Sequence, residues 1–591
     1  MDWERGEEAV SLIKKGMALA LVAGMMMGMA PTSAFAADDT SYTKFPYTIE
    51  AEDMDNTKGE LITKVYQDEF PGYSGKGFVY LTNKNFSFTV NVKEDGMYEL
   101  TTRALQFITD DGRMQTVSVN GTDYTKVIPM TRDWIDFDFG MIRLHKGKNT
   151  LTFKPVYGYM VMDTVTLEKA KFPSLKTATD KPCDKKADAS AKELLKYLKK
   201  VYGKGILAGQ QEIYGGGHKN QTTIRYDAAT NTCKDSTGKT YTFKEEDKAV
   251  ADDGSKFVWH CYDEDGQVYD YDSQNRGYSY CDYDYEMKYL EKTTGKLPAI
   301  RGFDFGSYCP CYKWDDGVAN RMIDWGKNKG GICTASWHVN VPKVMSSYTY
   351  NEPLDFSATT YTPQTDFVTA NCLKKGTAEY DYYNLCVKNL AEELKKVQKA
   401  GVPIIFRPFH EAEGNGGLDG SGAWFWWSKE GADVFKALWK NLYKQLTEDY
   451  GIHNLIWEEN LYTWSNTSKE WYVGDEYTDL VAYDKYNTQY HRHDGKTSGP
   501  NLDAESGYFW ELSDYVKGGK MVAMAENDSI PSLENLKVEH AAWLYFCPWY
   551  DDAQSPFVSG TQYQDKKELK KLYNSNYCIT LDELPKWKST K

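Results

Sequence analysis

Short runs of alternating apolar and polar residues fill the chain from residue 47 to residue 168. Examples are "FSFTVNV" (86–92), "MYELTTRAL" (97–105) and "NTLTFKPV" (149–156), and Gly, Asn and Asp separate one run from the next. A period of two places every second side chain on one face of a strand, so each run predicts a half-buried strand. Because no helical pattern lies between the runs, we predict an antiparallel β-sandwich over residues 40–170.

A linker follows at 171–190, rich in Lys, Thr, Asp and Pro, and from residue 191 onward the pattern changes. Apolar runs now alternate with stretches of helical periodicity. The clearest helices are predicted over 380–401 and 433–451, where apolar residues recur at intervals of three and four. Gly401 stands where the first of these helices would end.

Eight apolar runs in the segment 191–591 end in a polar or aromatic residue. Eight β-α units in about 400 residues predict a (β/α)8 barrel, whose active site lies at the carboxyl ends of the strands. The residues at the eight predicted strand ends are Glu212, Asp304, His338, Glu411, Glu458, Asp484, Glu526 and Trp549. The long insertion at 213–280, crowded with Tyr and Asp, reads equally well as a decorated rim, the wall of a groove or a cation site.

The first 36 residues have the composition of an export signal. Lys14 and Lys15 precede an apolar stretch, and Ala34-Phe35-Ala36 forms an A-x-A cleavage site. The apolar stretch is too short to span a membrane, and no later segment reaches about 18 apolar residues. We therefore expect a secreted protein that has no membrane segment after signal removal.

Charge and composition narrow the function. The formal net charge is −15 and no basic stripe is present, which argues against nucleic-acid binding. Aromatic residues make up 15% of the chain, and Tyr and Trp in such numbers suit flat amphipathic ligands such as sugars. The eleven cysteines allow disulfides in an exported protein, but their pairing does not follow from the sequence. We expect a monomer.

The spacing of residues does not match three known kinds of site: a zinc hydrolase site, a serine nucleophile elbow and a dinucleotide-binding loop. The pair His410-Glu411 does not continue as H-E-x-x-H, because Gly414 stands three residues after Glu411. No G-x-S-x-G nucleophile elbow follows a predicted strand, and the glycines of "GNGGLDGSG" do not fit a dinucleotide-binding loop. No cofactor is expected for catalysis.

A pair of carboxylates is the remaining candidate for the catalytic groups. Cleavage of a glycosidic bond needs one carboxylic acid to protonate the leaving oxygen and a second carboxylate to attack or to activate water. Glu411 ends the fourth predicted strand and Glu526 the seventh, on opposite sides of a barrel mouth. A lone strand-end Glu is more often a helix cap or the partner of a cation such as Arg407. Two of them beside histidine and tryptophan favour catalysis.

At these residues the chain resembles glycoside hydrolase family 26, a family of retaining (β/α)8 enzymes dominated by endo-β-1,4-mannanases. The matching segments occur in the order of the family between about residues 195 and 575. They are "SWHV" (336–339), "RPFHE" (407–411), "WFWW" (424–427), "DLVAYDKYN" (479–487), "MVAMAENDSIP" (521–531) and "CPWYDD" (547–552).

The resemblance implies that Glu411 is the acid/base and Glu526 the nucleophile, with Tyr486 as hydrogen-bond donor to Glu526. It also implies sugar contacts from His338, His410, Trp424, Asp484 and Trp549. A secreted endo-β-1,4-mannanase acting on mannan, glucomannan or galactomannan is therefore expected. Another retaining β-glycanase, acting on mixed-linkage glucan or β-1,3-xylan, and a non-catalytic polysaccharide-binding protein are the alternatives.

The predicted sandwich resembles a family 35 carbohydrate-binding module, through "YTIEAEDM" (47–54), "GYSGKGFVYL" (72–81), "GMYELTTRAL" (96–105) and "MDTVTLE" (162–168). The resemblance implies a structural calcium ion at Glu50, Glu52 and Asp163, and oxygen-only ligands suit calcium. The same residues are otherwise surface charges on strands. Trp134 is a candidate sugar platform or, equally, a core residue.

Overall fold

A computed structural model describes most of the chain. The described residues are 42–57, 64–82, 84–110, 112–154, 159–173, 175, 178–214, 218–264, 266–273, 276–312, 315–465, 467–486, 492, 494, 496–552 and 554–587. The expected signal segment, 1–36, lies outside these ranges. None of the helices within them has the length and hydropathy that a membrane span needs.

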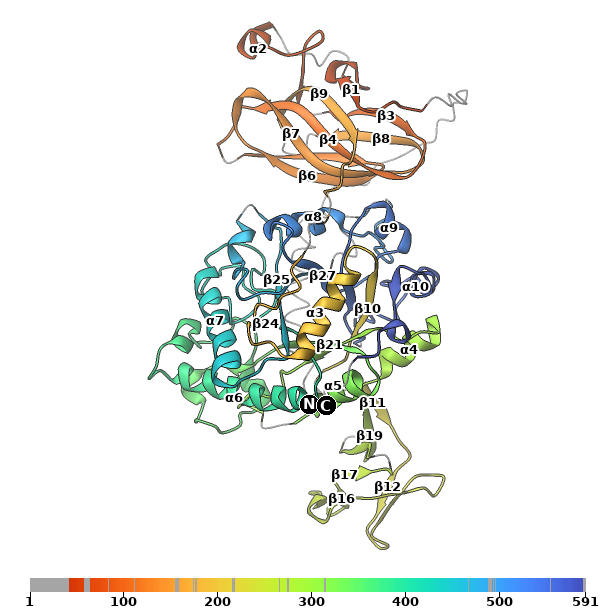
Figure 1. Cartoon of the computed structure of the whole chain (residues 1–591), viewed down its shortest axis with the longest axis vertical. Helices are drawn as coiled ribbons and strands as arrows, with labels where there is room; N and C mark the ends of the chain where they lie inside the picture. Colours follow the sequence, from red (N-terminus) through yellow and green to blue (C-terminus); the bar gives the residue numbers. More distant parts are fainter. Residues whose placement is uncertain are drawn as a thin grey trace.

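The N-terminal part is a sandwich of two antiparallel sheets (Figure 1). One sheet has the order β1 (Tyr47–Glu50), β9 (Met160–Lys169), β4 (Gly96–Gln106), β7 (Thr131–Leu144), with β2 (Val79–Leu81) also paired to β9; the other has the order β3 (Phe86–Val92), β8 (Gly147–Lys154), β5 (Arg113–Val119), β6 (Thr122–Ile128). The predicted alternation is real, since Phe86, Phe88, Val90 and Val92 are buried between the sheets. A short helix, α2 (Lys64–Glu69), was not expected from the pattern.

The C-terminal part is a closed barrel of parallel strands, which confirms the predicted fold class. The strands, in spatial order, are β10 (Ile206–Gln211), β20 (Ile300–Asp304), β21 (Ile332–Trp337), β24 (Ile404–Pro408), β25 (Leu455–Asn460), β26 (Leu480–Lys485), β27 (Met521–Asn527) and β28 (Tyr545–Pro548). The strand β10 pairs with β20 on one side and with β28 on the other, and so closes the barrel. Nearly every barrel residue is buried, as expected for a parallel sheet covered on its outer face.

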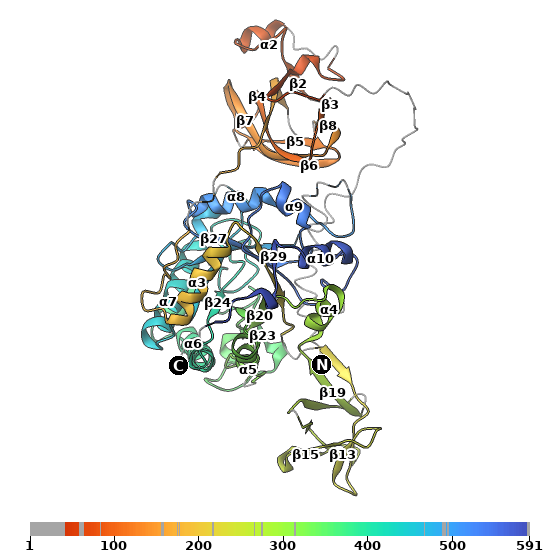
Figure 2. The same ribbon diagram turned by 45° about the vertical axis from the view of Figure 1, so that its right-hand side comes forward.

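Helices surround the barrel (Figures 1 and 2). They are α3 (Ala189–Val201), α4 (Tyr285–Thr294), α5 (Val318–Ile323), α6 (Ala378–Lys399), α7 (Ala432–Lys444), α8 (Ser506–Tyr515), α9 (Leu533–Val538) and α10 (Lys566–Tyr573). The hydroxyl of Thr377 caps α6 by accepting a hydrogen bond from the Tyr380 amide, and Gly401 follows its end with a φ of 76°. Between β25 and β26, where a regular β-α unit predicts an α-helix, the described residues hold only the 3-10 turn Ser468–Trp471.

The insertion after the first barrel strand forms a small β-module that extends away from the barrel (Figures 1 and 2). Its strands are β11 (His218–Gln221), β12 (Arg225–Asp227), β13 (Thr232–Lys234), β14 (Thr240–Tyr241), β15 (Lys248–Val250), β16 (Lys256–Val258), β17 (His260–Tyr262), β18 (Val268–Asp272) and β19 (Gly277–Asp282). The first and last strands pair with each other, so the module leaves and rejoins the barrel at one place. His218, at the start of the module, connects it to the barrel domain through an ion pair of 2.5 Å with Glu286 on α4.

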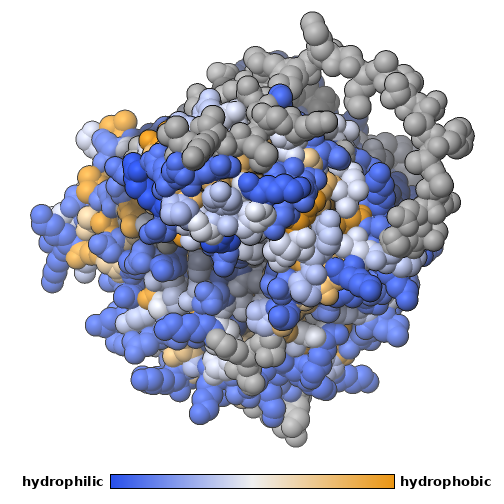
Figure 3. All heavy atoms as spheres, turned by 90° about the horizontal axis from the view of Figure 1, so that it is seen from above, coloured by the Kyte–Doolittle hydropathy of each residue, from blue (hydrophilic) through white to orange (hydrophobic). Residues whose placement is uncertain are grey.

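The sandwich contacts the barrel domain through buried polar groups. Arg143 of β7 donates to Asn535 at 2.6 Å and pairs with Glu539 at 3.2 Å, both in or next to α9. Its other guanidinium nitrogen lies 3.3 Å from Asp95 of the sandwich. Figure 3 looks down on this end of the molecule, and its surface there is mostly hydrophilic with small, separate hydrophobic patches.

Candidate active site

Glu411 lies just beyond the carboxyl end of β24, on a backbone that turns sharply. Phe409 and Glu411 have φ values of 49° and 52°, a left-handed conformation that is uncommon for residues other than glycine and concentrates at functional sites. The side chain of Asn460, at the end of β25, accepts a hydrogen bond of 2.8 Å from the Glu411 amide. The neighbouring strand thus stabilises the turn that points Glu411 into the barrel mouth.

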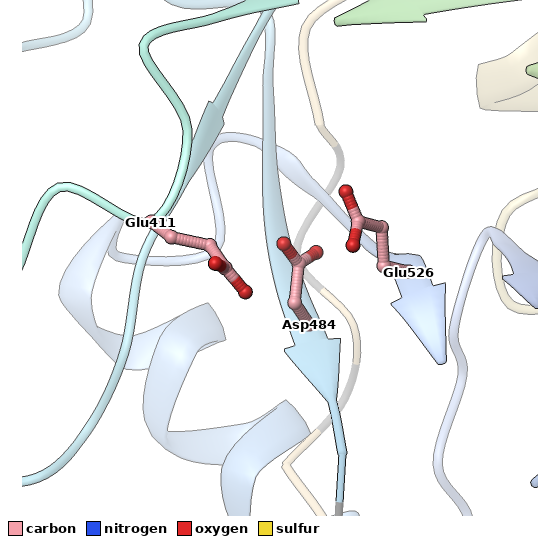
Figure 4. Close-up of side chains that lie close together, drawn as sticks. All are labelled: Glu411, Asp484 and Glu526. Carbon is pink, nitrogen blue, oxygen red and sulfur yellow. The ribbon is translucent and has the colours of Figure 1, made fainter. Parts of the chain in front are cut away.

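Glu526 sits inside β27, where the strand register is irregular. Tyr483 of β26 pairs with Met524, but Asp484 pairs with Glu526, so one residue of β27 is bulged out. Bulges re-aim the side chains beside them. Here the irregularity leaves Asp484 and Glu526 side by side over the same barrel mouth, where Figure 4 shows Asp484 between Glu411 and Glu526.

The two glutamates face each other at short range. One carboxylate oxygen from each of Glu411, Asp484 and Glu526 lies within 4.8 Å of the others, and all three residues are buried. Carboxyl groups about 5–5.5 Å apart are typical of retaining glycosidases, whereas inverting enzymes need about 6.5–9.5 Å to admit a water molecule. The separation in this site is that of a retaining pair.

Arg407 supplies positive charge to this cluster. Its guanidinium donates to Asp484 at 2.9 Å and forms a second, shorter ion pair with Glu526. Burial raises the pKa of Asp484 well above its usual range, and Glu526 and Glu411 act in the same direction, although Arg407 opposes them. Three carboxyl groups suit a cation, and the guanidinium of Arg407 takes that role for two of them, Asp484 and Glu526.

Two phenols donate to the two glutamates. Tyr486 donates to Glu526 Oε2 at 2.7 Å, and Tyr462 donates to Glu411 Oε1 at 2.8 Å. Burial raises the pKa of each phenol well above its usual value, and the nearby carboxylate adds to that shift. Both phenols therefore stay protonated and act as donors.

The two histidines stand together beside Glu526. His338 Nδ1 lies 2.6 Å from Asp304 Oδ2, and His410 Nε2 lies 3.9 Å from Glu526 Oε1. Burial alone would raise the pKa of Asp304, but the charge of His338 and the hydrogen bonds from His338 and Ser336 outweigh it, and the net shift is downward. An ionised Asp304 orients the His338 ring, which meets the His410 ring edge to face at 4.4 Å.

The tryptophans of the "WFWW" segment (424–427) differ in their exposure. Trp426 and Trp427 are fully buried, and their indole nitrogens donate to backbone carbonyls of Val339 and His410. They support the strand ends and cannot stack on sugars, so Trp424 is the tryptophan of the "WFWW" segment that remains available to a sugar. Trp424 is partly exposed and meets Tyr462 edge to face at 5.9 Å.

Trp549 follows β28 and is also partly exposed. Its ring centroid lies 6.1 Å from that of His338 and 6.1 Å from that of Tyr214. Tyr214 in turn stacks on His338 at 5.3 Å and 11°. The structure therefore brings the predicted residues His410 and Trp549, and also Tyr214, together around His338.

Sequence reasoning missed Tyr214, Asn460 and Tyr462, and it named the strand-end residue Glu458 without its partner Tyr545. Tyr214 follows the first barrel run by three residues, and Tyr462 follows the fifth by two, so each stands where a strand-end search could have extended. Glu458 lies beneath the site, accepts a 2.5 Å hydrogen bond from Tyr545, and has its pKa raised to about 7 by burial. Tyr545 belongs to β28, so this partnership requires the closed barrel.

In the sandwich, Ser74 links two of the three residues expected at a calcium site, Glu50 and Asp163, and the third, Glu52, binds the Lys76 amide. Ser74 donates its hydroxyl to Glu50 at 2.7 Å and its amide to Asp163 at 2.9 Å, and Lys76 donates its amide to Glu52 at 2.6 Å. Glu52 Oε2 is buried without a hydrogen-bond partner among the described residues. This unpartnered carboxylate oxygen fits a cation that prefers oxygen. The three carboxylates do not form a compact ligand set, since among the described residues only Glu411, Asp484 and Glu526 bring oxygens within 4.8 Å of one another.

Arg103 and Trp134 lie in the same part of the sandwich. Arg103 pairs with Asp163 through a short ion pair, so Asp163 is already neutralised on one side. Trp134 donates its indole N–H to Pro71 O at 3.1 Å and packs on Phe78 at 5.2 Å. Its partial exposure leaves one part of the ring outside this packing.

Comparison with known proteins points to the same chemistry. The sequence profile of Glycosyl hydrolase family 26 matches residues 259–583, more than half of the chain. A mannan endo-1,4-β-mannosidase from Thermothelomyces thermophilus is 28% identical over 530 residues, which cover 88% of this chain and 87% of that protein. A mannan endo-1,4-β-mannosidase B from Piromyces sp. is 26% identical over 547 residues, covering 90% and 77%.

Solved structures give a similar result. A ruminal GH26 endo-β-1,4-mannanase is 49% identical, with a TM-score of 0.75 over 93% of this chain and 100% of that one. The GH26-CBM35 β-(1,4)-mannanase of Podospora anserina is 25% identical, with a TM-score of 0.55 over 91% and 98%. With its barrel, its carboxylate pair and the family profile across more than half of its length, the chain belongs to glycosyl hydrolase family 26.

Proposed function

We propose that this glycoside hydrolase is an endo-β-1,4-mannanase that cleaves internal bonds of mannan, glucomannan or galactomannan with retention. The observation that carries the mechanism is the placement of Glu411 and Glu526, with carboxylate oxygens within 4.8 Å across the barrel mouth. The substrate is supported by the relatives, which include endo-β-1,4-mannanases that match almost the whole chain.

In the first step Glu411 protonates the glycosidic oxygen while Glu526 attacks the anomeric carbon, giving a covalent glycosyl-enzyme. The leaving chain departs as an alcohol. Glu411, now ionised, removes a proton from water, and the water oxygen displaces Glu526 with a second inversion. Arg407 and Tyr486 stabilise the Glu526 carboxylate when it is free, because both are hydrogen-bond donors to its charged form.

The deciding experiment is the product profile of the purified chain on glucomannan, galactomannan, β-1,3-xylan and barley β-glucan, with Glu526→Ala in parallel. We expect manno-oligosaccharides from the wild type alone. Azide should restore turnover to Glu526→Ala and give a glycosyl azide of inverted configuration, because the small anion replaces the missing nucleophile. Asp484→Asn cannot serve as the control, since Asp484 and Glu526 share Arg407. The matched control is Glu448→Ala, an exposed residue of the π-helix Gln445–Asp449.

Each alternative gives a different outcome of this experiment. Release from β-glucan or xylan alone would keep the retaining mechanism and change the substrate. No release from any polysaccharide by the wild type would contradict the proposal and leave a polysaccharide-binding protein.

We also propose that the sandwich is a carbohydrate-binding module stabilised by calcium. The buried, unpartnered Glu52 Oε2 supports a cation there, held by Glu50, Glu52 and Asp163. Thermal unfolding of the full chain should shift to higher temperature with added CaCl2 after EDTA treatment. Glu52→Gln should abolish the shift and Asp123→Asn, on the opposite sheet, should keep it; an equal response of both variants would contradict the site.

Export is a further proposal, supported by the composition of residues 1–36. N-terminal sequencing of protein recovered from culture medium should begin after Ala36. Recovery of the uncleaved chain inside the cell would contradict it.

A further inference from the structure

The insertion module contains two cysteines whose sulfur atoms lie next to each other. Cys233 Sγ and Cys261 Sγ are 2.9 Å apart, and both residues are completely buried. Cys233 belongs to β13 and Cys261 to β17. Sulfur atoms of a disulfide are about 2.0 Å apart, so a displacement of about 0.9 Å would join this pair.

The two sheets of the module are joined by backbone hydrogen bonds between Thr242 and Tyr262 and by a small apolar core. Its buried apolar side chains form a small cluster of their own, separate from the barrel core: Ile224, Cys233, Tyr241, Val258, Cys261 and Tyr278. The core of a module of about 65 residues rarely supplies more than about 3–5 kcal/mol of stability, so a covalent link would add a large fraction to it. In this cluster the two cysteines are the pair able to form such a link.

The position of the pair suits a cross-link. The strand β13 belongs to the three-stranded sheet β12–β13–β14, whereas β17 is the edge of the four-stranded sheet β11–β19–β18–β17. A bond between Cys233 and Cys261 would join these two sheets across the centre of the cluster. It would also close a loop of about 29 residues, which restricts the unfolded module.

The other cysteine of the module has a different setting. Cys281 is half-buried on β19, and the contact found for its sulfur is with Asp270 at 4.0 Å. Burial raises its pKa to about 11, so it is a poor nucleophile at neutral pH. It therefore serves as the matched control for the pair.

We propose that Cys233 and Cys261 form a structural disulfide that holds the two sheets of the insertion module together. Its formation removes one proton and one electron from each thiol, and a disulfide oxidant, such as oxidised glutathione or a disulfide-bearing oxidoreductase, accepts both electrons and both protons and is reduced to two thiol groups. Because both sulfurs are buried in the folded module, the bond forms while the module folds. The proposal relies on export for its oxidant, since thiols stay reduced in the cytosol.

Peptide mapping tests the bond directly. The chain without residues 1–36 is refolded from urea in a mixture of reduced and oxidised glutathione, unfolded again, alkylated with N-ethylmaleimide and digested. The peptide containing Cys233 should be found linked to the peptide containing Cys261, and the two should separate after reduction. Full alkylation of both cysteines, or a link from either one to another cysteine, would overturn the proposal.

Limited proteolysis tests the structural role. Cleavage within the module of the oxidised wild type should be at least about tenfold slower than after reduction with a phosphine. Cys233→Ala and Cys261→Ala should be cleaved at the fast rate under both conditions, and Cys281→Ala should behave as the wild type. If the oxidised and the reduced wild type are cleaved at equal rates and the linked peptide is absent, the proposal is contradicted without the need for a variant.

The refolding arm also separates this proposal from that of export. A chain that is retained in the cell but becomes linked when refolded with glutathione would contradict export and keep the disulfide. A secreted chain whose Cys233 and Cys261 are both alkylated would support export and contradict the disulfide.

Discussion

The phenol of Tyr462 donates a hydrogen bond of 2.8 Å to Oε1 of Glu411 from a ring that is 2% exposed. Tyr462 lies in the segment that follows β25, and the Asn460 amide oxygen two residues earlier accepts from the Glu411 backbone. One segment thus holds both the main chain and the side chain of the proposed acid. The acid is positioned by a neighbouring strand, while its own turn has an uncommon backbone conformation.

Glu411→Ala should separate substrates by their leaving groups. We expect kcat/KM on glucomannan to fall by about 10²–10⁴-fold, because a sugar alkoxide leaves only when protonated. A dinitrophenyl manno-oligosaccharide, whose leaving group needs no proton, should lose far less. Glu413→Gln is the control, since its buried carboxyl is two residues away and bonds to Ser468; an equal loss on both substrates in Glu411→Ala would contradict the assignment.

Tyr486→Phe should weaken catalysis without emptying the site. A hydrogen bond to a charged group contributes about 1.5–3 kcal/mol, so losing the one to Glu526 should lower kcat/KM by about 10–150-fold. Stopped-flow or steady-state rates on glucomannan measure the change. Tyr563→Phe, a phenol with no contact to Glu526 among those described, should stay near the wild type. A wild-type rate in Tyr486→Phe would show that Arg407 alone suffices to hold Glu526.

Trp464 is expected to bind sugar next to the acid. Its ring is 45% exposed, stacks on Tyr462 at 4.7 Å and 23°, and is fixed by a hydrogen bond of 2.9 Å to Gly414 O. Trp464→Ala should raise KM for glucomannan about 3–10-fold with a smaller change in kcat, because a stacking contact of about 0.5–1.5 kcal/mol is lost. Trp464→Phe should retain part of the stacking contact. Tyr450→Ala, which precedes β25 at the opposite end of the barrel, should leave KM and kcat unchanged.

Glu458 makes stability depend on pH. Its pKa is about 7 in the folded chain, against an ordinary 4.5, because burial disfavours the charged form. Below pH 4.5 Glu458 is protonated in both the folded and the unfolded chain. Between pH 4.5 and pH 7 it ionises in the unfolded chain only. The free energy of unfolding therefore falls as the pH rises, by about 3 kcal/mol in total.

Glu458→Gln does not ionise and keeps an acceptor for Tyr545. Relative to the wild type, its free energy of unfolding should therefore improve by about 3 kcal/mol between pH 4 and pH 8. Urea unfolding at the two pH values measures this, with the exposed Glu448→Gln as control. Parallel pH profiles of wild type and Glu458→Gln would contradict a buried, protonated Glu458.

Much of the fold and part of the site follow from the sequence. Alternation at Phe86, Phe88, Val90 and Val92 predicted the sandwich, because burial between sheets selects every second side chain. The apolar runs predicted the barrel strands, and the fold rule that strand ends carry the site singled out Glu411 and Glu526. The segment between β25 and β26, where the sequence analysis named no helix, holds a 3-10 turn, and its Tyr462 donates to Glu411.

The sequence by itself determined the two architectures and the residues that carry charge at the strand ends, because periodicity and strand-end chemistry are local properties of the chain. Only the tertiary structure decided that Arg407 joins Asp484 to Glu526, that Trp426 and Trp427 are core, and that Cys233 meets Cys261. Each of these depends on side chains from different strands or sheets meeting in space. Such distances are set by barrel closure, by the irregular β26–β27 register and by sheet packing, none of which has a local signature in the sequence.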